Sequence, residues 1–153
     1  MTLKSVLVKD LMAGKSGDVG SVSVDATVRD AARVIADMRI GILVIFDANK
    51  NFKGLISERD IARVLADHGA DAGDVIAVEV ATKNVTGCKP DTDLEFVLES
   101  MRTKHFRHMP VMEGDKIVGV ISMGDILRYL LNERSDFEKQ KKKGSVFSKV
   151  FGG

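Results

Sequence analysis

Apolar residues recur along this chain with two periods. Spacings of three and four residues predict amphipathic helices, and short aliphatic or β-branched runs bounded by polar turns predict strands. The order helix, strand, strand, helix occurs twice. The predicted elements are helices over 28–39 and 94–103, strands over 42–46, 52–56, 109–112 and 117–121, and later helices carrying Ile61, Val64 and Leu65 or Ile126, Tyr129 and Leu130.

The order of elements repeats because the sequence itself repeats. The segment from Gly54 to Leu65 aligns with the segment from Gly119 to Leu130 at a constant offset of 65, and seven of the twelve positions are identical. Upstream, apolar positions match at an offset of 66, so the length difference falls in the polar turn between the strands, where an insertion costs little. One unit of roughly 60 residues would be marginally stable, so two units are expected to pack together.

The predicted fold class is α/β in the α+β sense, with two helix-strand-strand-helix units packed through their sheets as a pseudo-twofold pair. The first unit is predicted over residues 4–66 and the second over 76–132, with a Gly- and Asp-rich linker over 67–75. Residues 133–153 are predicted to form a polar, basic and mobile tail. Each unit has a short lead-in, and the pattern favours aligning Val8–Met12 with Val78–Thr82.

Composition narrows the functional classes. The chain has 23 basic and 22 acidic residues, a formal charge of +1, which argues against a dedicated DNA-wrapping surface. A single cysteine, Cys88, cannot form an internal disulfide, and three scattered histidines do not suit a zinc framework. Charged residues interrupt the N-terminal segment, and the most apolar run, Ile42–Phe46, is too short for a membrane helix. We therefore expect a soluble cytoplasmic protein.

The junction between the second strand and the following helix has the same motif in both units, Ser57-x-x-Asp60 and Ser122-x-x-Asp125. One interpretation is a capping box, in which Ser and an acidic residue satisfy free helix donors. The other is a ligand site, because a helix N-terminus favours anions and an Asp carboxylate can accept both hydrogens of a ribose diol. Glycine-led strands precede both motifs, which favours ligand binding without excluding the cap.

The whole pattern closely resembles a tandem pair of cystathionine-β-synthase-type (CBS) domains, the Bateman module. The resemblance rests on the lead-in, the Gly-x-Ile-Ser-x-Arg-Asp segment before Ile61, and a second copy that contains Arg107-His108-Met109-Pro110-Val111. The resemblance covers about residues 4–131, and the chain is most similar to small stand-alone bacterial CBS-pair proteins. It implies a sensor of adenosyl ligands such as AMP, ADP, ATP, NADH or S-adenosylmethionine, with no required cofactor.

The resemblance also implies residue roles. Asp60 and Asp125 would hold ribose hydroxyls, with Ser57 and Ser122 at ribose or phosphate. The segments Ala81–Val85 and Met12–Lys15 would line the adenine pocket. The full set of predicted nucleotide-binding residues is Ser57, Arg59, Asp60, Thr82, Lys83, Asn84, Arg107, His108, Pro110, Ser122 and Asp125.

The two clefts are expected to be unequal. The first unit has Gly41-Ile42-Leu43-Val44 where the second has Arg107-His108-Met109-Pro110, whereas Arg59 of the first unit is replaced by Gly124. We expect the stronger site in the cleft served by Asp125 together with Arg107 and His108, and a weaker site on Asp60.

Other functional classes have less support. No nucleophile elbow or Gly-rich phosphate loop is present, so no enzyme, catalytic residue or metal site is predicted. The resemblance implies a homodimer and an unidentified effector protein. Two alternatives stay open: a ligand-free structural interaction module, and a nucleic-acid- or membrane-binding protein that uses the basic tail. In that tail, Val146-Phe147 and Val150-Phe151 recur four residues apart beside lysines.

Overall fold

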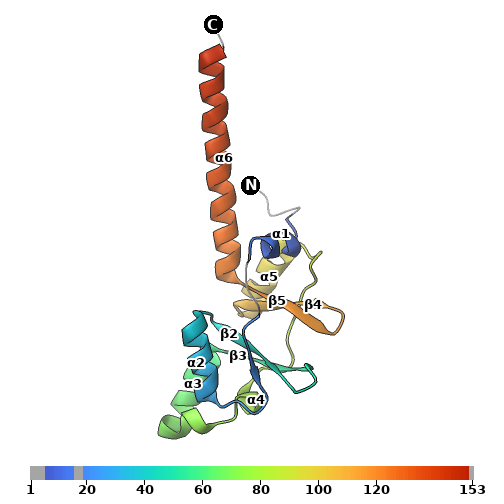
Figure 1. The fold of residues 1–153 in the computed structure, drawn as a ribbon, viewed down its shortest axis with the longest axis vertical. Helices are drawn as coiled ribbons and strands as arrows, with labels where there is room; N and C mark the ends of the chain where they lie inside the picture. The colour runs from blue at the N-terminus through green and yellow to red at the C-terminus, as the bar shows by residue number, and fades with distance from the viewer. Residues whose placement is uncertain (1–5, 16–18, 152–153) are drawn as a thin grey trace.

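A computed structural model describes residues 6–15 and 19–151. Two small sheets lie between layers of helices, and one long helix extends away from them (Figure 1). The elements, in chain order, are α1 Val8–Ala13, β1 Ser21–Ser23, α2 Val28–Met38, β2 Ile42–Phe46, β3 Phe52–Ser57, α3 Glu58–His68, the 3-10 helix η1 Gly69–Asp74, α4 Ala77–Val80, α5 Leu94–Lys104, β4 His108–Glu113, β5 Lys116–Ser122 and α6 Met123–Phe151.

The two sheets are built in the same way, which confirms the predicted repeat. In the first unit, β1 pairs in parallel with β2, and β2 pairs antiparallel with β3. In the second, β4 pairs antiparallel with β5, and Cys88 forms a parallel bridge to Val111 in the place of β1. A register shift follows Ile45 in one sheet and Val111 in the other, at matching positions of the repeat. The sequence did not predict β1, which has one apolar residue among three.

The helices of each unit form where the periodicity predicts them. Val28, Ala31 and Ile35 lie on the buried face of α2, and this helix begins at a capping box between Thr27 and Asp30. The corresponding face of α5 is buried through Leu94, Val97 and Met101. Burial of these apolar stripes against the sheets stabilises both helices more than their intrinsic propensity does. The predicted α+β class with two paired units is therefore confirmed.

The lead-in helices pack across the molecule. Val8 and Leu11 of α1 belong to the core of the second unit, whereas Ala77 of α4 belongs to the core of the first. Figure 1 shows α1 beside α5, and α4 close to the first sheet. Each unit therefore completes its core with a segment from the other half of the chain.

The predicted alignment of the lead-ins is wrong by one residue. Helix α1 begins at Val8 and α4 begins at Ala77, which is 69 residues later. The surrounding backbone hydrogen bonds agree: Val8 N donates to Thr92 O, as Ala77 N donates to Ala26 O. Helices of six and four residues carry too little periodicity for the sequence to set their register. On this alignment, Lys15 corresponds to Asn84.

The segments outside the repeat are more regular than the sequence predicts. In the predicted linker, α3 runs to His68 and η1 follows, with Ala72 buried in the core of the first unit. The tail is not an irregular extension, because α6 continues through it to Phe151. Nine of the 19 residues over 133–151 are Lys, Arg, Glu or Gln, which are good helix formers. The tail's predicted apolar pairs at 146–147 and 150–151 have side chains outside the described part of the chain. None of the described helices is long and apolar enough to span a membrane.

Candidate functional site

Two clefts lie between the units, each at the junction of a strand and a helix that carries the repeated motif. The first cleft has a volume of about 360 Å³ and lies at the end of β3, and the second has about 430 Å³ and lies at the end of β5. Both volumes fall in the range of roughly 300 to 1,000 Å³ typical of small-molecule sites. Polar residues of the first cleft are Ser57, Glu58, Arg59, Asp60, Arg63, Thr82, Asn84, Thr86, Lys104, Arg107 and His108, and those of the second are Lys15, Arg39, His108, Ser122, Asp125 and Arg128.

The motif forms a cap in both units, so the capping interpretation holds. Asp60 N donates to Ser57 Oγ at 3.3 Å, and Ser57 N donates back to Asp60 Oδ2 at 2.8 Å. In the second unit, the matching distances are 3.0 Å and 2.8 Å for Ser122 and Asp125. One carboxylate oxygen therefore serves the cap, while both carboxylates still line their clefts.

The second oxygen of each carboxylate faces an arginine that was not among the predicted site residues. Arg63 Nη1 lies 3.5 Å from Asp60 Oδ1, and Arg128 Nη1 lies 3.4 Å from Asp125 Oδ1. Both arginines are largely exposed, so these pairs add little stability. Both copies of the repeat have an arginine at this position, and this identity is the signal in the sequence that could have revealed the two residues.

The first cleft gathers positive charge that is available to a ligand. Arg59 donates to the His105 carbonyl oxygen at 3.4 Å, and Lys104 donates to Thr86 Oγ1 at 3.1 Å. Among the described side chains, neither of these residues nor Arg107 forms an ion pair with a carboxylate, and all three line this cleft. Lys104 was also absent from the predicted site. Three such cations around one cavity suit a phosphate group.

The predicted grouping of Arg107 with Asp125 is wrong. Arg107 lines the first cleft, with Asp60, whereas Asp125 lines the second. His108 lies between them and lines both clefts. Arg107 precedes β4 and Asp125 lies in α6, so only the packing of the chain, and not the sequence, shows which carboxylate shares a cavity with Arg107. Among the described residues, more cations without a carboxylate partner therefore line the first cleft, which was predicted to be the weaker site.

The imidazole of His108 forms a wall between the clefts. A Cβ atom added to Gly41 would lie 3.0 Å from His108 Nε2, so the absence of a side chain at Gly41 makes room for the ring. Burial lowers the pKa of His108 and outweighs the opposing effect of the Asp125 and Glu58 carboxylates. At neutral pH the ring is therefore mostly uncharged and offers hydrogen bonds rather than a full positive charge.

The segment after α4 forms another side of the first cleft. Thr82 exchanges two backbone hydrogen bonds of 2.9 Å with Leu55 of β3, which places Asn84 and Thr86 along the cavity. Pro110 also lines this cleft. Lys83 is exposed and is not among the described residues that line either cleft. Ten of the eleven predicted site residues thus lie at one of the two clefts.

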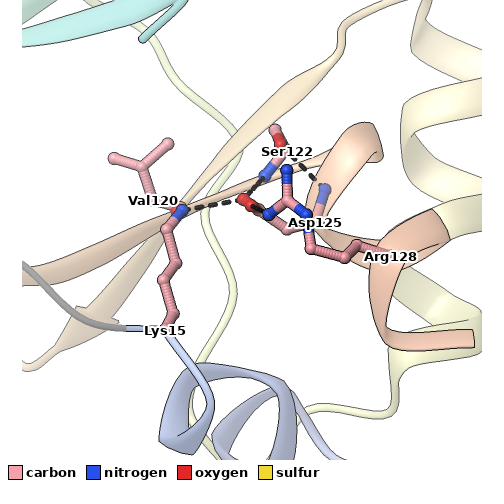
Figure 2. Close-up of polar contacts among 5 residues, drawn as sticks. All are labelled: Lys15, Val120, Ser122, Asp125 and Arg128. Atoms are coloured by element: carbon pink, nitrogen blue, oxygen red, sulfur yellow. Dashed lines mark hydrogen bonds and ion pairs between the residues drawn. The ribbon is translucent and has the colours of Figure 1, made fainter. Parts of the chain in front are cut away.

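The second cleft contains a short ion pair. Lys15 Nζ lies 2.7 Å from Asp125 Oδ2 and donates to the Val120 carbonyl oxygen at 2.6 Å (Figure 2). Burial alone would raise the pKa of Asp125, but hydrogen bonds from Lys15 and Ser122 outweigh it, so the pKa lies below its ordinary value. The carboxylate of the second cleft is therefore ionised and already neutralised by the chain itself.

Other reactive groups lie apart from these clefts. The buried thiol of Cys88 contacts the Pro110 carbonyl oxygen at 3.7 Å, and burial raises its pKa to about 11. It is therefore a poor nucleophile at neutral pH. Within the described ranges, no group of three or more His, Cys, Asp or Glu side chains could hold a metal ion.

Comparison with known families gives a match over most of the chain. The family model of the CBS domain matches twice, at residues 8–67 and 76–132. A protein from Acidianus ambivalens described as an uncharacterized 17.7 kDa protein is 29% identical over 127 residues, covering 79% of this chain and 76% of that protein. Arabinose 5-phosphate isomerase KdsD from Yersinia pestis is 32% identical over 111 residues, covering 72% of this chain but only 34% of the isomerase.

Solved structures share the fold. A CBS-domain containing protein from Agrobacterium tumefaciens superposes with a TM-score of 0.77 at 34% identity, over 80% of this chain and 91% of that one. A CBS domain protein from Pyrobaculum aerophilum, complexed with AMP, has a TM-score of 0.71 at 26% identity, over 86% and 99%. The CBS domain pair of protein MJ0100, in complex with 5-methylthioadenosine and S-adenosyl-L-methionine, has a TM-score of 0.72 at 25% identity, over 84% and 98%.

Proposed function

Because this chain belongs to the CBS domain family and carries two copies of that domain, we propose that it is a regulatory module that binds an adenosyl ligand in the first cleft. The ligand class is AMP, ADP or ATP, with NADH as a further member. The observation that carries the proposal is the first cleft itself: a carboxylate at a helix N-terminus in a cavity that is also lined by three cations with no carboxylate partner among the described residues.

Each part of an adenine nucleotide has a suitable partner there. Asp60 Oδ1 accepts from the ribose hydroxyls, because Oδ2 is already engaged in the cap. Arg59, Lys104 and Arg107 bind phosphate, where charge-assisted hydrogen bonds are strongest. The segment that contains Thr82 and Asn84 lies along the base, with its polar groups facing the cavity.

Two relatives support the ligand class. The Pyrobaculum aerophilum protein is complexed with AMP, and the MJ0100 pair with 5-methylthioadenosine and S-adenosyl-L-methionine. Adenine and ribose are common to all three compounds, so the shared part of the ligand is the nucleoside. The cations of the first cleft favour a phosphorylated ligand over an uncharged nucleoside.

The regulatory output follows from a difference in ligand affinity between two arrangements of the units. A ligand between the units favours the arrangement that it binds more tightly, and this shifts the affinity for an effector protein. We propose that the acting species is a homodimer. Phe96 of α5 and Leu127 and Leu131 of α6 are 57%, 58% and 57% exposed, respectively, and provide apolar surface for a second copy. Light scattering after size exclusion measures this oligomeric state directly.

Calorimetric titration tests the ligand and its cleft. We expect AMP or ATP to bind the unaltered protein, and Asp60→Asn to weaken binding about ten- to a hundredfold, because a charge-assisted hydrogen bond to ribose is lost. Arg107→Ala should weaken AMP by a similar factor but adenosine much less, since it removes only a phosphate contact. Asp67→Asn, an exposed carboxylate on the same helix, is the control.

The opposite results are equally informative. If AMP, ADP, ATP, NADH and S-adenosylmethionine all fail to bind, the chain acts as an interaction module without a nucleotide. If binding is unchanged in both Asp60→Asn and Arg107→Ala, the ligand occupies another place.

A further inference from the structure

The second cleft differs from the first in what its carboxylate already contacts. Lys15 extends from the segment after α1 and ends between Asp125 and the Val120 carbonyl oxygen, as Figure 2 shows. The Asp125 side chain is 12% exposed, close to the 15% of Asp60, and that of Lys15 is 43% exposed, so Lys15 changes the charge beside the carboxylate more than its burial. Asp125 Oδ2 accepts from both Lys15 Nζ and Ser122 N.

The matching atoms of the first cleft are satisfied differently. Val120 corresponds to Leu55 in the repeat, and the Leu55 carbonyl oxygen accepts from the backbone of Thr82. Asp60 Oδ2 accepts from the Ser57 hydroxyl at 2.7 Å rather than from an ammonium group. Lys15 therefore donates the hydrogen bonds in the second cleft that the Thr82 backbone and the Ser57 hydroxyl donate in the first.

The residue that corresponds to Lys15 in the first cleft is neutral. The starts of α1 and α4 and their flanking bridges, Leu7 to Asp93 and Ile76 to Thr27, align the two lead-ins, and counting on from these starts pairs Lys15 with Asn84, although α1 runs to Ala13 and α4 only to Val80. Both line their own cleft. On this alignment, a Lys in place of an Asn gives Asp125 a second cation, in addition to the arginine that each carboxylate faces.

We propose that Lys15 is an internal cation that excludes nucleosides from Asp125, so that each chain binds one adenosyl ligand, in the first cleft. The inference rests on the proposed function. Arg63 and Arg128 lie at the matching Oδ1 atoms of Asp60 and Asp125, so this pair is common to both clefts. In the second cleft Lys15 also neutralises Asp125 at Oδ2, and a ribose that uses both carboxylate oxygens must first displace Lys15 from two acceptors. Loss of charge-assisted hydrogen bonds of this kind reduces affinity by about ten- to a hundredfold.

A reciprocal exchange tests the proposal. In titrations with AMP, the unaltered protein should bind one equivalent per chain, and Lys15→Asn should add a second equivalent. Asn84→Lys should weaken the first site about ten- to a hundredfold, because its ammonium group can reach Asp60. Lys9→Asn on α1, an exposed lysine outside both clefts, is the control. Thermal unfolding of each variant shows that it remains folded.

Three outcomes overturn the proposal: two equivalents bound by the unaltered protein, one equivalent still bound by Lys15→Asn, or weaker binding in Lys15→Asn. The last would mean that Lys15 turns to the phosphate. A failure of the proposed function looks different, because the unaltered protein then binds no AMP. In that case, one equivalent gained by Lys15→Asn supports the role of Lys15, and none gained refutes it.

A carboxyl titration by NMR is independent of ligand: Lys15→Asn should raise the pKa of Asp125, and an unchanged pKa would refute the contact.

Discussion

The first and second units share a framework but differ in their clefts. Matching positions form the strands, the register shift and the cap in both, and each core is completed by a lead-in helix from the other half of the chain. The clefts differ at exposed or half-exposed positions such as Asn84 and Lys15, or Arg59 and Gly124. The difference shows that packing holds two copies to one shape, whereas cleft residues can diverge because they contribute little to the cores.

The largest expected effect is on the free energy of unfolding, and it tests whether the two cores are equivalent. Ile56 and Ile121 occupy the same position of the repeat, and both are fully buried. We expect Ile56→Ala and Ile121→Ala each to lower the free energy of unfolding by about 2 to 5 kcal/mol, because each leaves a cavity in a packed core. Urea denaturation measures this, with exposed Lys116→Ala as control. A small loss in only one of the two would show that the cores are not equivalent.

A smaller effect distinguishes the two units at a close approach. A Cβ atom at Gly54 would lie 2.9 Å from the Ala81 Cβ and 3.3 Å from the Thr82 carbonyl oxygen, neither of which can move freely. At Gly119 the nearest atom, at 2.6 Å, is the flexible end of the Met12 side chain. We therefore expect Gly54→Ala to cost about 1 to 3 kcal/mol and Gly119→Ala less than about 1 kcal/mol.

Thermal and urea unfolding of the two alanine variants measure this difference. Equal losses would contradict it, and they would mean that Met12 is as rigidly held as the backbone at Thr82.

The smallest effect concerns the turns between the paired strands. In the first unit, hydrogen bonds from the side chain and backbone of Asn51 lower the pKa of Asp47 to about 2. In the second, Gly114 takes the left-handed conformation, at φ 59°. Because the pKa of Asp47 is lowered by folding, its contribution to stability is complete above pH 3.8 and is lost as the pH falls towards 2.

Carboxyl NMR titration should give a midpoint near 2 for Asp47, and Asn51→Ala should raise it. A midpoint near 3.8 in the native protein would show that this turn lacks the hydrogen bonds described.

The sequence predicted the repeated frame closely. The strand predicted over 42–46 matches β2, and the helix predicted over 94–103 differs from α5 by one residue. Helix α5 buries a stripe with helical spacing and β2 buries a continuous apolar run, so the apolar residues in the sequence correspond directly to the buried positions. Ser57 and Asp60 were also located at their junction, because a helix cap depends on residues three positions apart.

The clefts were predicted less well. Arg107 was assigned to the wrong carboxylate, and Lys104 and Arg63 were not included in the site. Lys15 was considered only as part of a segment along the base, although it forms an ion pair with Asp125. Long cationic side chains are mobile and reach several ångströms, so their partners depend on the surrounding backbone rather than on their neighbours in sequence.

The amino-acid sequence by itself determined two copies of a helix-strand-strand-helix unit, each with a serine and an aspartate at a helix N-terminus, because these features follow from local periodicity and capping. Only the tertiary structure decided which lead-in helix completes which core and which cation faces which aspartate. Lys15 and Asp125 are 110 residues apart, and contacts over such a separation depend on how the whole chain packs.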